Sequence, residues 1–185
     1  MRKYIILYKP FLVFLGKFFL TYILLTLVYQ GYLQRYGDTE VDSITTLVAD
    51  NSKDLLRVFA IDFKTEKNTS DLFIKLIYKQ KYIARMVEGC NAISIIILFI
   101  AFIVSFSRKI KTTILFILKG SVAIYILNVI RIALLCVLLY YFPEYEKFSH
   151  RVLFPLLIYG FVFVLWIIWI AKFSLYVKNN TPKQS

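Results

Sequence analysis

Four long apolar segments constrain the fold of this 185-residue chain more than any other feature. They are roughly Pro10–Leu33, Asn91–Ser107, Thr113–Tyr141 and Val152–Phe173. Each is close to, or longer than, the ~20 apolar residues that a helix needs to cross a bilayer core. Hydrophobic residues make up 59% of the chain, which is more than soluble domains contain. We therefore expect an all-α polytopic membrane protein with four transmembrane helices, formed as a single membrane domain over residues 1–185.

The distribution of charge predicts the orientation of these helices. The N-terminal region up to Lys17, the second connection with Lys119, and the C-terminal tail together carry eleven Lys or Arg and no Asp or Glu. The connection 34–91 carries nine basic and nine acidic residues, and the connection 140–151 carries two of each. The positive-inside rule therefore predicts cytoplasmic termini and two extracytoplasmic connections. Topology and contact with anionic lipids explain the basic excess, so nucleic acid is not an expected partner.

The first extracytoplasmic connection, about residues 34–90, is expected to form a small ordered cap. Between Val41 and Phe63, apolar residues recur at helical spacing with charges between them. This pattern favours one or two amphipathic helices on the membrane surface or over the spans. The stretch Leu72–Val87 mixes β-branched and aromatic residues around Lys79-Gln80-Lys81. It fits a short β-hairpin before Cys90 or a continued helix.

A cysteine, an arginine and the only histidine stand near the ends of three different apolar segments. Cys90 precedes the second segment, Arg131 lies in the outer part of the third, and His150 comes just before the fourth. The predicted topology brings all three to the extracytoplasmic face. Such residues can serve as a nucleophile, an anion binder and a general base, because histidine ordinarily titrates near neutral pH. The pattern indicates acyl-transfer chemistry at the membrane surface.

These residues also have other interpretations. A free cysteine is commonly a small buried hydrophobe, as we expect for Cys136, and a Cys90–Cys136 disulfide is compatible with the topology. Arg131 is costly inside a membrane and could brace the spans instead of binding an anion. Asn128, one helical turn earlier, is placed to orient its guanidinium. One histidine and scattered carboxylates give no metal-ligand cluster, so neither a metal nor a cofactor is expected.

The sequence around these residues resembles the exosortase/archaeosortase family of membrane transpeptidases. The landmarks, in the family's order, are Glu88-Gly89-Cys90-Asn91-Ala92, Asn128-Val129-Ile130-Arg131, and Ser149-His150 before an apolar span. The resemblance covers roughly residues 72–171 and points to short bacterial members of the exosortase F type. It implies that the catalytic residues are Cys90, Arg131 and His150, with Asn128, Glu88 and Asn91 in supporting positions.

The resemblance also implies a function and a location. Members of the family cut the C-terminal sorting signals of exported proteins outside the membrane, through a thioacyl-enzyme intermediate. The expected partners are therefore a sorting-signal helix and membrane lipids, and the expected location is the bacterial inner membrane with an extracytoplasmic active site. Many members have Ser-Gly or Ala-Gly where this chain has Asn91-Ala92, so the backbone around the cysteine is expected to differ. Larger relatives also have more spans. The alternative function is a non-catalytic scaffold or accessory subunit in which Arg131 is a structural brace.

Overall fold

Long helices dominate this chain. The computed structural model describes residues 2–37, 40–59, 61–68, 71–107 and 109–180, and the side chains of residues 2–7, 150 and 173–180 lie outside this description. Three helical stretches, Tyr8–Leu33, Ile110–Tyr141 and Pro143–Lys172, are long and apolar enough to cross a membrane. The expected class of long membrane-type helices is therefore confirmed, with three such stretches in the described residues.

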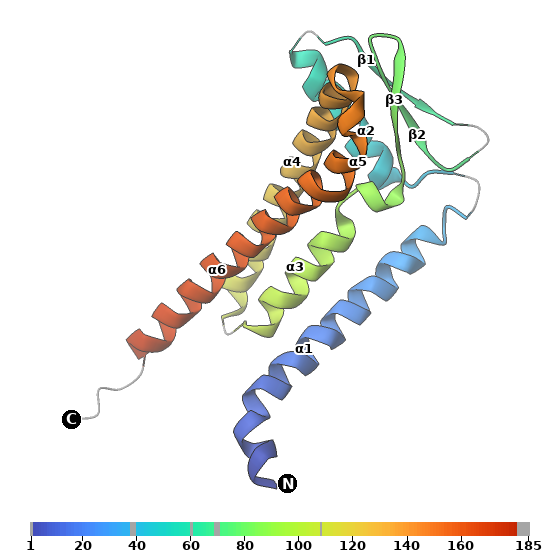
Figure 1. Ribbon diagram of the computed structural model, residues 1–185. Helices are drawn as coiled ribbons and strands as arrows, with labels where there is room; N and C mark the ends of the chain where they lie inside the picture. The colour runs from blue at the N-terminus through green and yellow to red at the C-terminus, as the bar shows by residue number, and fades with distance from the viewer. Residues whose placement is uncertain (1, 38–39, 60, 69–70, 108, 181–185) are drawn as a thin grey trace.

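Helix α1, Arg2–Leu33, begins ahead of the predicted segment, so Pro10 lies inside it. A proline within a helix removes one backbone donor and its ring clashes with the preceding turn. Figure 1 shows α1 bending near its N-terminal end, as such a residue would cause. The described side chains of the helix are mostly exposed and apolar, which suits a surface that faces lipid.

Helix α3, Ile93–Ser105, is shorter than the predicted segment 91–107. The Asn91 side-chain oxygen accepts a hydrogen bond from the Ile93 N–H at 3.0 Å, and Ala92 has a left-handed backbone with φ of 63°. The helix therefore cannot begin before Ile93. Its 13 residues span about 20 Å, less than the ~30 Å of a hydrocarbon core.

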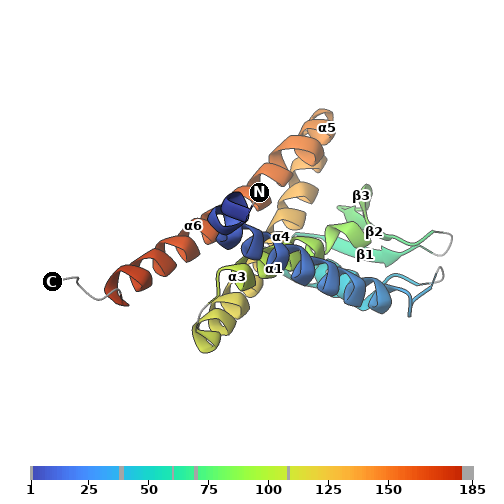
Figure 2. The same cartoon turned by 90° about the horizontal axis from the view of Figure 1, so that it is seen from below.

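Helices α4, Ile110–Tyr141, and α6, Phe154–Asn180, form the rest of the helical framework. Seen from below, they diverge from the end where α5 lies (Figure 2). Helix α3 packs against both of them and against α1. The core that the three helices share contains Phe99 of α3, Ile124 of α4 and Trp169 of α6.

A small antiparallel sheet follows helix α2, Ser43–Val58. Its strands are β1, Phe63–Lys67, β2, Ile74–Tyr78, and β3, Lys81–Met86, in the order β1-β2-β3. The expected hairpin is confirmed as β2–β3, and its turn places Lys79 and Gln80 at positive φ, as a type I′ hairpin turn requires. Strand β1 was not predicted, because charged residues dominate it and hide the alternation. The described part of the chain is mostly helical, as expected, and it adds one three-stranded sheet to the predicted all-α class.

Helix α2 and the sheet, together called the α2–sheet unit, pack around the second half of α4. The buried face of α2 includes Val48 and Leu56, which join Phe63 of β1 and Ile132 of α4 in one core. The Asn51 amide also donates to the Tyr125 hydroxyl at 2.6 Å. One amphipathic helix therefore forms where the sequence predicted one or two, and it lies against α4.

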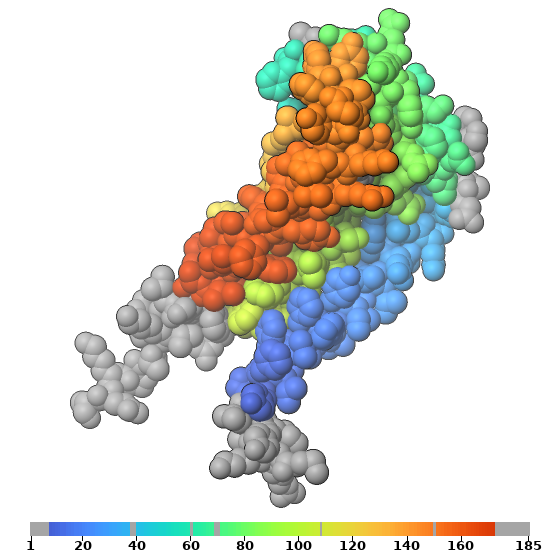
Figure 3. Space-filling model, in the orientation of Figure 1, coloured from blue at the N-terminus to red at the C-terminus, as the bar shows by residue number. Residues whose placement is uncertain are grey.

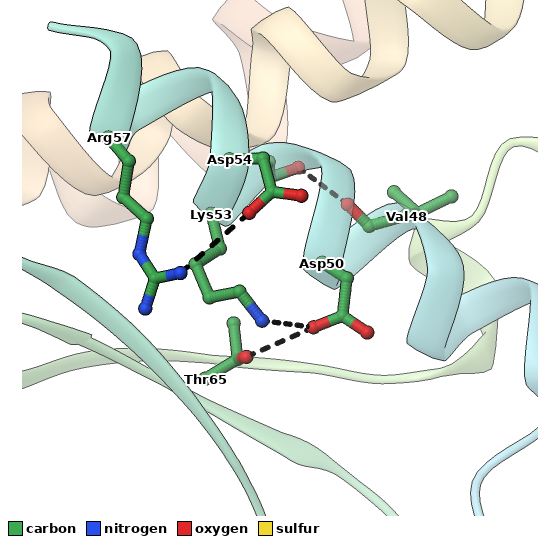
Figure 4. Close-up of polar contacts among 7 residues, drawn as sticks. Val48, Asp50, Lys53, Asp54, Arg57 and Thr65 are labelled. Carbon is green, nitrogen blue, oxygen red and sulfur yellow. Dashed lines mark hydrogen bonds and ion pairs between the residues drawn. The ribbon is translucent and has the colours of Figure 1, made fainter.

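Polar contacts on the outer face of α2 join it to the sheet. Asp50 accepts hydrogen bonds from Lys53 and, at 3.4 Å, from Thr65 of β1 (Figure 4). A second pair, Arg57 with Asp54 at 3.9 Å, is exposed. Exposed pairs of this kind contribute little to stability, so the apolar core is what holds the α2–sheet unit on α4.

Both connections that were predicted to share a face lie at one end of the molecule. After α4, the chain passes through η2, Pro143–Tyr145, α5, Glu146–Phe148, and the π-helical turn η3, Ser149–Leu153, before α6 begins. This connection and the α2–sheet unit lie at the same end of the helices, while α1 begins and α6 ends at the other (Figure 1).

Candidate functional site

Cys90 closes a short 3₁₀ turn, η1, Glu88–Cys90, between the last strand and α3. Its N–H donates to the Val87 carbonyl at 2.8 Å, which fixes the turn. The Cys90 side chain is partly exposed, whereas Cys136 is fully buried in the core of the α2–sheet unit. Both cysteines are free thiols, so the disulfide alternative is not realised in this structure.

Asn128 of α4 joins Cys90 to Arg131. Its Nδ2 donates to the Cys90 carbonyl at 2.8 Å, and its Oδ1 accepts a hydrogen bond from Arg131 Nη1 at 3.3 Å. The Asn128 side chain is completely buried, and a buried amide is costly unless its polar atoms are bonded. Asn128 thus contacts the Arg131 guanidinium, and the same amide contacts the turn that carries the thiol.

The guanidinium of Arg131 lies near both the thiol and the start of α6. Its Cζ is 5.9 Å from the centroid of the buried Phe154 ring, within the range of a cation–π interaction. It is also within electrostatic range of Cys90 and Tyr159. Its buried Nε has no hydrogen-bond partner among the described residues. The sequence analysis did not single out Phe154, although this aromatic residue lies one helical turn after His150.

Asn91 is a structural junction. Its Nδ2 donates to the Tyr29 hydroxyl at 2.8 Å and to Thr45 Oγ1 at 3.1 Å, while its Oδ1 caps α3 through Ile93. The side chain is buried. Asn91 thus ties α1, α2 and α3 together directly behind Cys90. No sequence signal indicated that Tyr29 and Thr45 were its partners, because they lie 62 and 46 residues away.

Glu88 faces a different cavity from the one beside the thiol. It lines a hollow of about 480 Å³ together with the end of α1, including Leu33 and Gln34. Burial raises the pKa of Glu88 above its usual range, and the nearby negative charge of Asp42 adds to this effect. Glu88 forms no ion pair with Arg131 within the described residues, and its supporting role stays a prediction.

The cavity beside Cys90 has a volume of about 540 Å³, within the ~300–1,000 Å³ typical of ligand pockets. One wall is β3 and the residue that follows it, with Tyr82, Ile83, Ala84, Arg85 and Val87. The opposite wall is formed by Leu139 of α4 and Glu146 of α5. The sequence analysis did not single out Glu146. Its position four residues before His150 was the one feature that could have pointed to it.

His150 lies in the π-helical turn that follows α5. The backbone places it four residues after Glu146, which lines the cavity of Cys90. Its side chain lies outside the described part of the structure. The role of His150 as general base therefore stays a prediction.

The donor groups described at this site are a thiol, an amide, a guanidinium and a carboxylate. No group of three or more His, Cys, Asp or Glu side chains lies close enough to hold a metal ion within the described ranges. Comparison of the chain with family models, curated proteins and solved structures finds no match.

Proposed function

We propose that this chain is a membrane-embedded cysteine peptidase or transpeptidase of the exosortase type. It would cut C-terminal sorting signals of exported proteins on the extracytoplasmic side of the bacterial inner membrane. The strongest support is the Asn128 amide, which bonds both the Cys90 backbone and Arg131 beside a cavity that Cys90 lines. One amide thereby links the backbone of Cys90 to an arginine 41 residues later in the chain.

The proposed topology has four crossings with the α2–sheet unit as an extracytoplasmic cap. Its support is the placement of both balanced connections at one end and both termini at the other (Figure 1). Helix α3 is too short to cross alone, so the residues that flank it must complete the second crossing. In this proposed topology, the turn with Cys90 would lie roughly 10 Å below the outer membrane surface.

The proposed reaction proceeds in two acyl transfers. Cys90 Sγ attacks the scissile carbonyl carbon, and His150 takes the thiol proton. Arg131 stabilises the negative charge that forms on the carbonyl oxygen. The C–N bond breaks as His150 gives the proton to the leaving amine, and a thioester to Cys90 remains. Water or an amine then attacks the thioester, loses a proton to His150, and releases the Cys90 thiol.

A scaffold function is the second candidate, and one observation favours it. The hydrogen bonds from Arg131 through Asn128 to the Cys90 carbonyl would also brace α4 against the turn before α3. This brace uses only the backbone of Cys90. A scaffold would therefore tolerate loss of the thiol, whereas the proposed enzyme would not.

The two cysteines offer a matched test of the proposed function. Cys90→Ala and Cys136→Ala are expressed in cells that lack the native gene, and exported proteins with an apolar C-terminal helix and a basic end are followed by mass spectrometry. We expect both variants at normal membrane levels, with tail removal abolished only for Cys90→Ala. Tail removal that persists in Cys90→Ala would contradict the enzyme and favour the scaffold.

A further inference from the structure

Among the residues that the structure describes, strand β3 has a strand partner on one side only, and four of its residues line the cavity of Cys90. The strand order β1-β2-β3 leaves β3 paired on one side only. About half of the backbone N–H and C=O groups of such a strand face away from its neighbour, where they can pair with another extended chain. Four residues after β3 ends, the chain reaches Cys90.

The lining residues show that the cavity follows this edge. Side chains alternate between the two faces of a strand, so a cavity over one face would be lined by every second residue. Here the consecutive residues 82–85 all line it. Ile83 is the extra residue of a β-bulge, because Leu76 pairs with Ala84 while Ile77 pairs with Tyr82. Bulges bend a strand and redirect its side chains, often beside active sites.

Leu139 of α4 and Glu146 of α5 complete the lining of the cavity. Leu139 belongs to an apolar cluster against which Ile83 and Ala84 pack, and the surfaces of β3 and the α5 segment adjoin on the face shown in Figure 3. A peptide beside β3 would therefore occupy the cavity itself. A strand added to a sheet lies about 4.8 Å from its neighbour. Arg85 and Glu146 carry opposite charges on the two walls, and neither takes part in an ion pair within the described residues.

We infer that the peptide substrate binds as an additional β-strand on the free edge of β3, with its scissile carbonyl delivered to Cys90. The inference rests on the proposed function and specifies how the substrate is held. Main-chain hydrogen bonds to β3 would supply affinity, and side-chain pockets would supply selectivity. A second copy of the chain fits this edge less well in the register centred on Ile83, where antiparallel pairing of two β3 strands would set Lys81 opposite Arg85.

Backbone methylation of a peptide probe tests this inference. The purified full-length Cys136→Ala protein in detergent is treated with tetrapeptidyl chloromethyl ketones, in which one backbone nitrogen at a time carries a methyl group. The alkylation rate of Cys90 is measured by mass spectrometry, with iodoacetamide as a probe that has no peptide backbone. We expect methylation at alternate positions to slow alkylation about tenfold, the scale of one lost hydrogen bond, with little effect at the positions between.

The outcomes separate the binding mode from the function. Equal rates for all methylated peptides, or peptides no faster than iodoacetamide, would overturn strand addition and leave Cys90 as a nucleophile. A Cys90 that reacts with neither probe until the protein is denatured would overturn the proposed function as well.

Charge reversal on the sheet provides an independent test. Arg85→Glu changes the cavity wall, and Lys64→Glu makes the same change on the exposed strand at the other edge. We expect Arg85→Glu to reverse the preference between glutamate-containing and lysine-containing peptide probes by about tenfold. Lys64→Glu should leave that preference unchanged. The same preference in both variants would exclude the edge of β3 as the binding wall.

Discussion

At the scale of single residues, one buried amide organises the candidate site. Asn128 bonds the carbonyl of Cys90 with its nitrogen and the guanidinium of Arg131 with its oxygen. An aspartate could accept from Arg131 but could not donate to the Cys90 carbonyl. The amide is therefore the functional group that fits both partners. Because Asn128 lies one helical turn before Arg131, its bond to the guanidinium was predictable from sequence. Its bond to the Cys90 carbonyl was not, since Cys90 lies 38 residues away.

Arg131→Lys separates a catalytic from a structural role of the arginine. Lysine keeps the charge but loses the planar fork that can hold an oxygen with two N–H groups. We expect turnover to fall by about 10²–10³, the usual cost of losing an oxyanion donor, with little change in melting temperature in detergent. The exposed Arg151→Lys is the control. Wild-type tail processing by Arg131→Lys would remove the arginine from the catalytic set.

At the scale of elements, three consecutive segments of the chain each form a different part of the candidate site. Strand β3 forms the wall of the cavity, the η1 turn carries Cys90, and α3 is anchored behind them through Asn91. The three hydrogen bonds of Asn91 fix the start of α3 against α1 and α2.

The packing of α3 on α4 depends on Gly120. A Cβ at this position would overlap the ring of the buried Phe99. We expect Gly120→Ala to lower the melting temperature in detergent, because overpacking of a filled core typically costs about 1–3 kcal/mol. Gly160→Ala in α6 is the matched control, since its Cβ would meet no atom within 4 Å. Equal melting temperatures for the two variants would show that α3 and α4 do not pack as described.

Elements with a strong local signal were predictable, and those set by distant contacts were not. Hydropathy located α1, α4 and α6, and residue type located the hairpin of β2 and β3. Strand β1 escaped because Lys64, Glu66 and Lys67 are charged, and its one buried side chain, Phe63, gains burial only through pairing with β2. The length of α3 was overestimated because a hydropathy window cannot register the left-handed backbone at Ala92. Glu146 was missed because its cavity forms only when α5 meets β3.

At the scale of the whole molecule, the lengths of the helices set the depth of the site. Helix α3 covers about 20 Å of a hydrocarbon core of ~30 Å. If its C-terminal end lies at the inner surface, Cys90 lies roughly 10 Å below the outer one. Helix α4 extends well beyond that level, and there the α2–sheet unit packs against it. The proposed site would therefore lie in a depression of the outer surface that both a peptide and water can enter.

The two ends of α4 provide the sharpest test of this arrangement. Eleven basic and no acidic residues mark the proposed inner face, so a reporter fused after Lys111 or at the C-terminus should report the cytoplasm. A reporter fused near Glu144, or inserted between residues 40 and 59, should report the outside. A membrane-impermeant maleimide should also label Cys90 in intact spheroplasts of the Cys136→Ala strain. A cytoplasmic Glu144 would place His150 and Cys90 on opposite faces of the membrane, and no exchange of a proton between them would then be achievable.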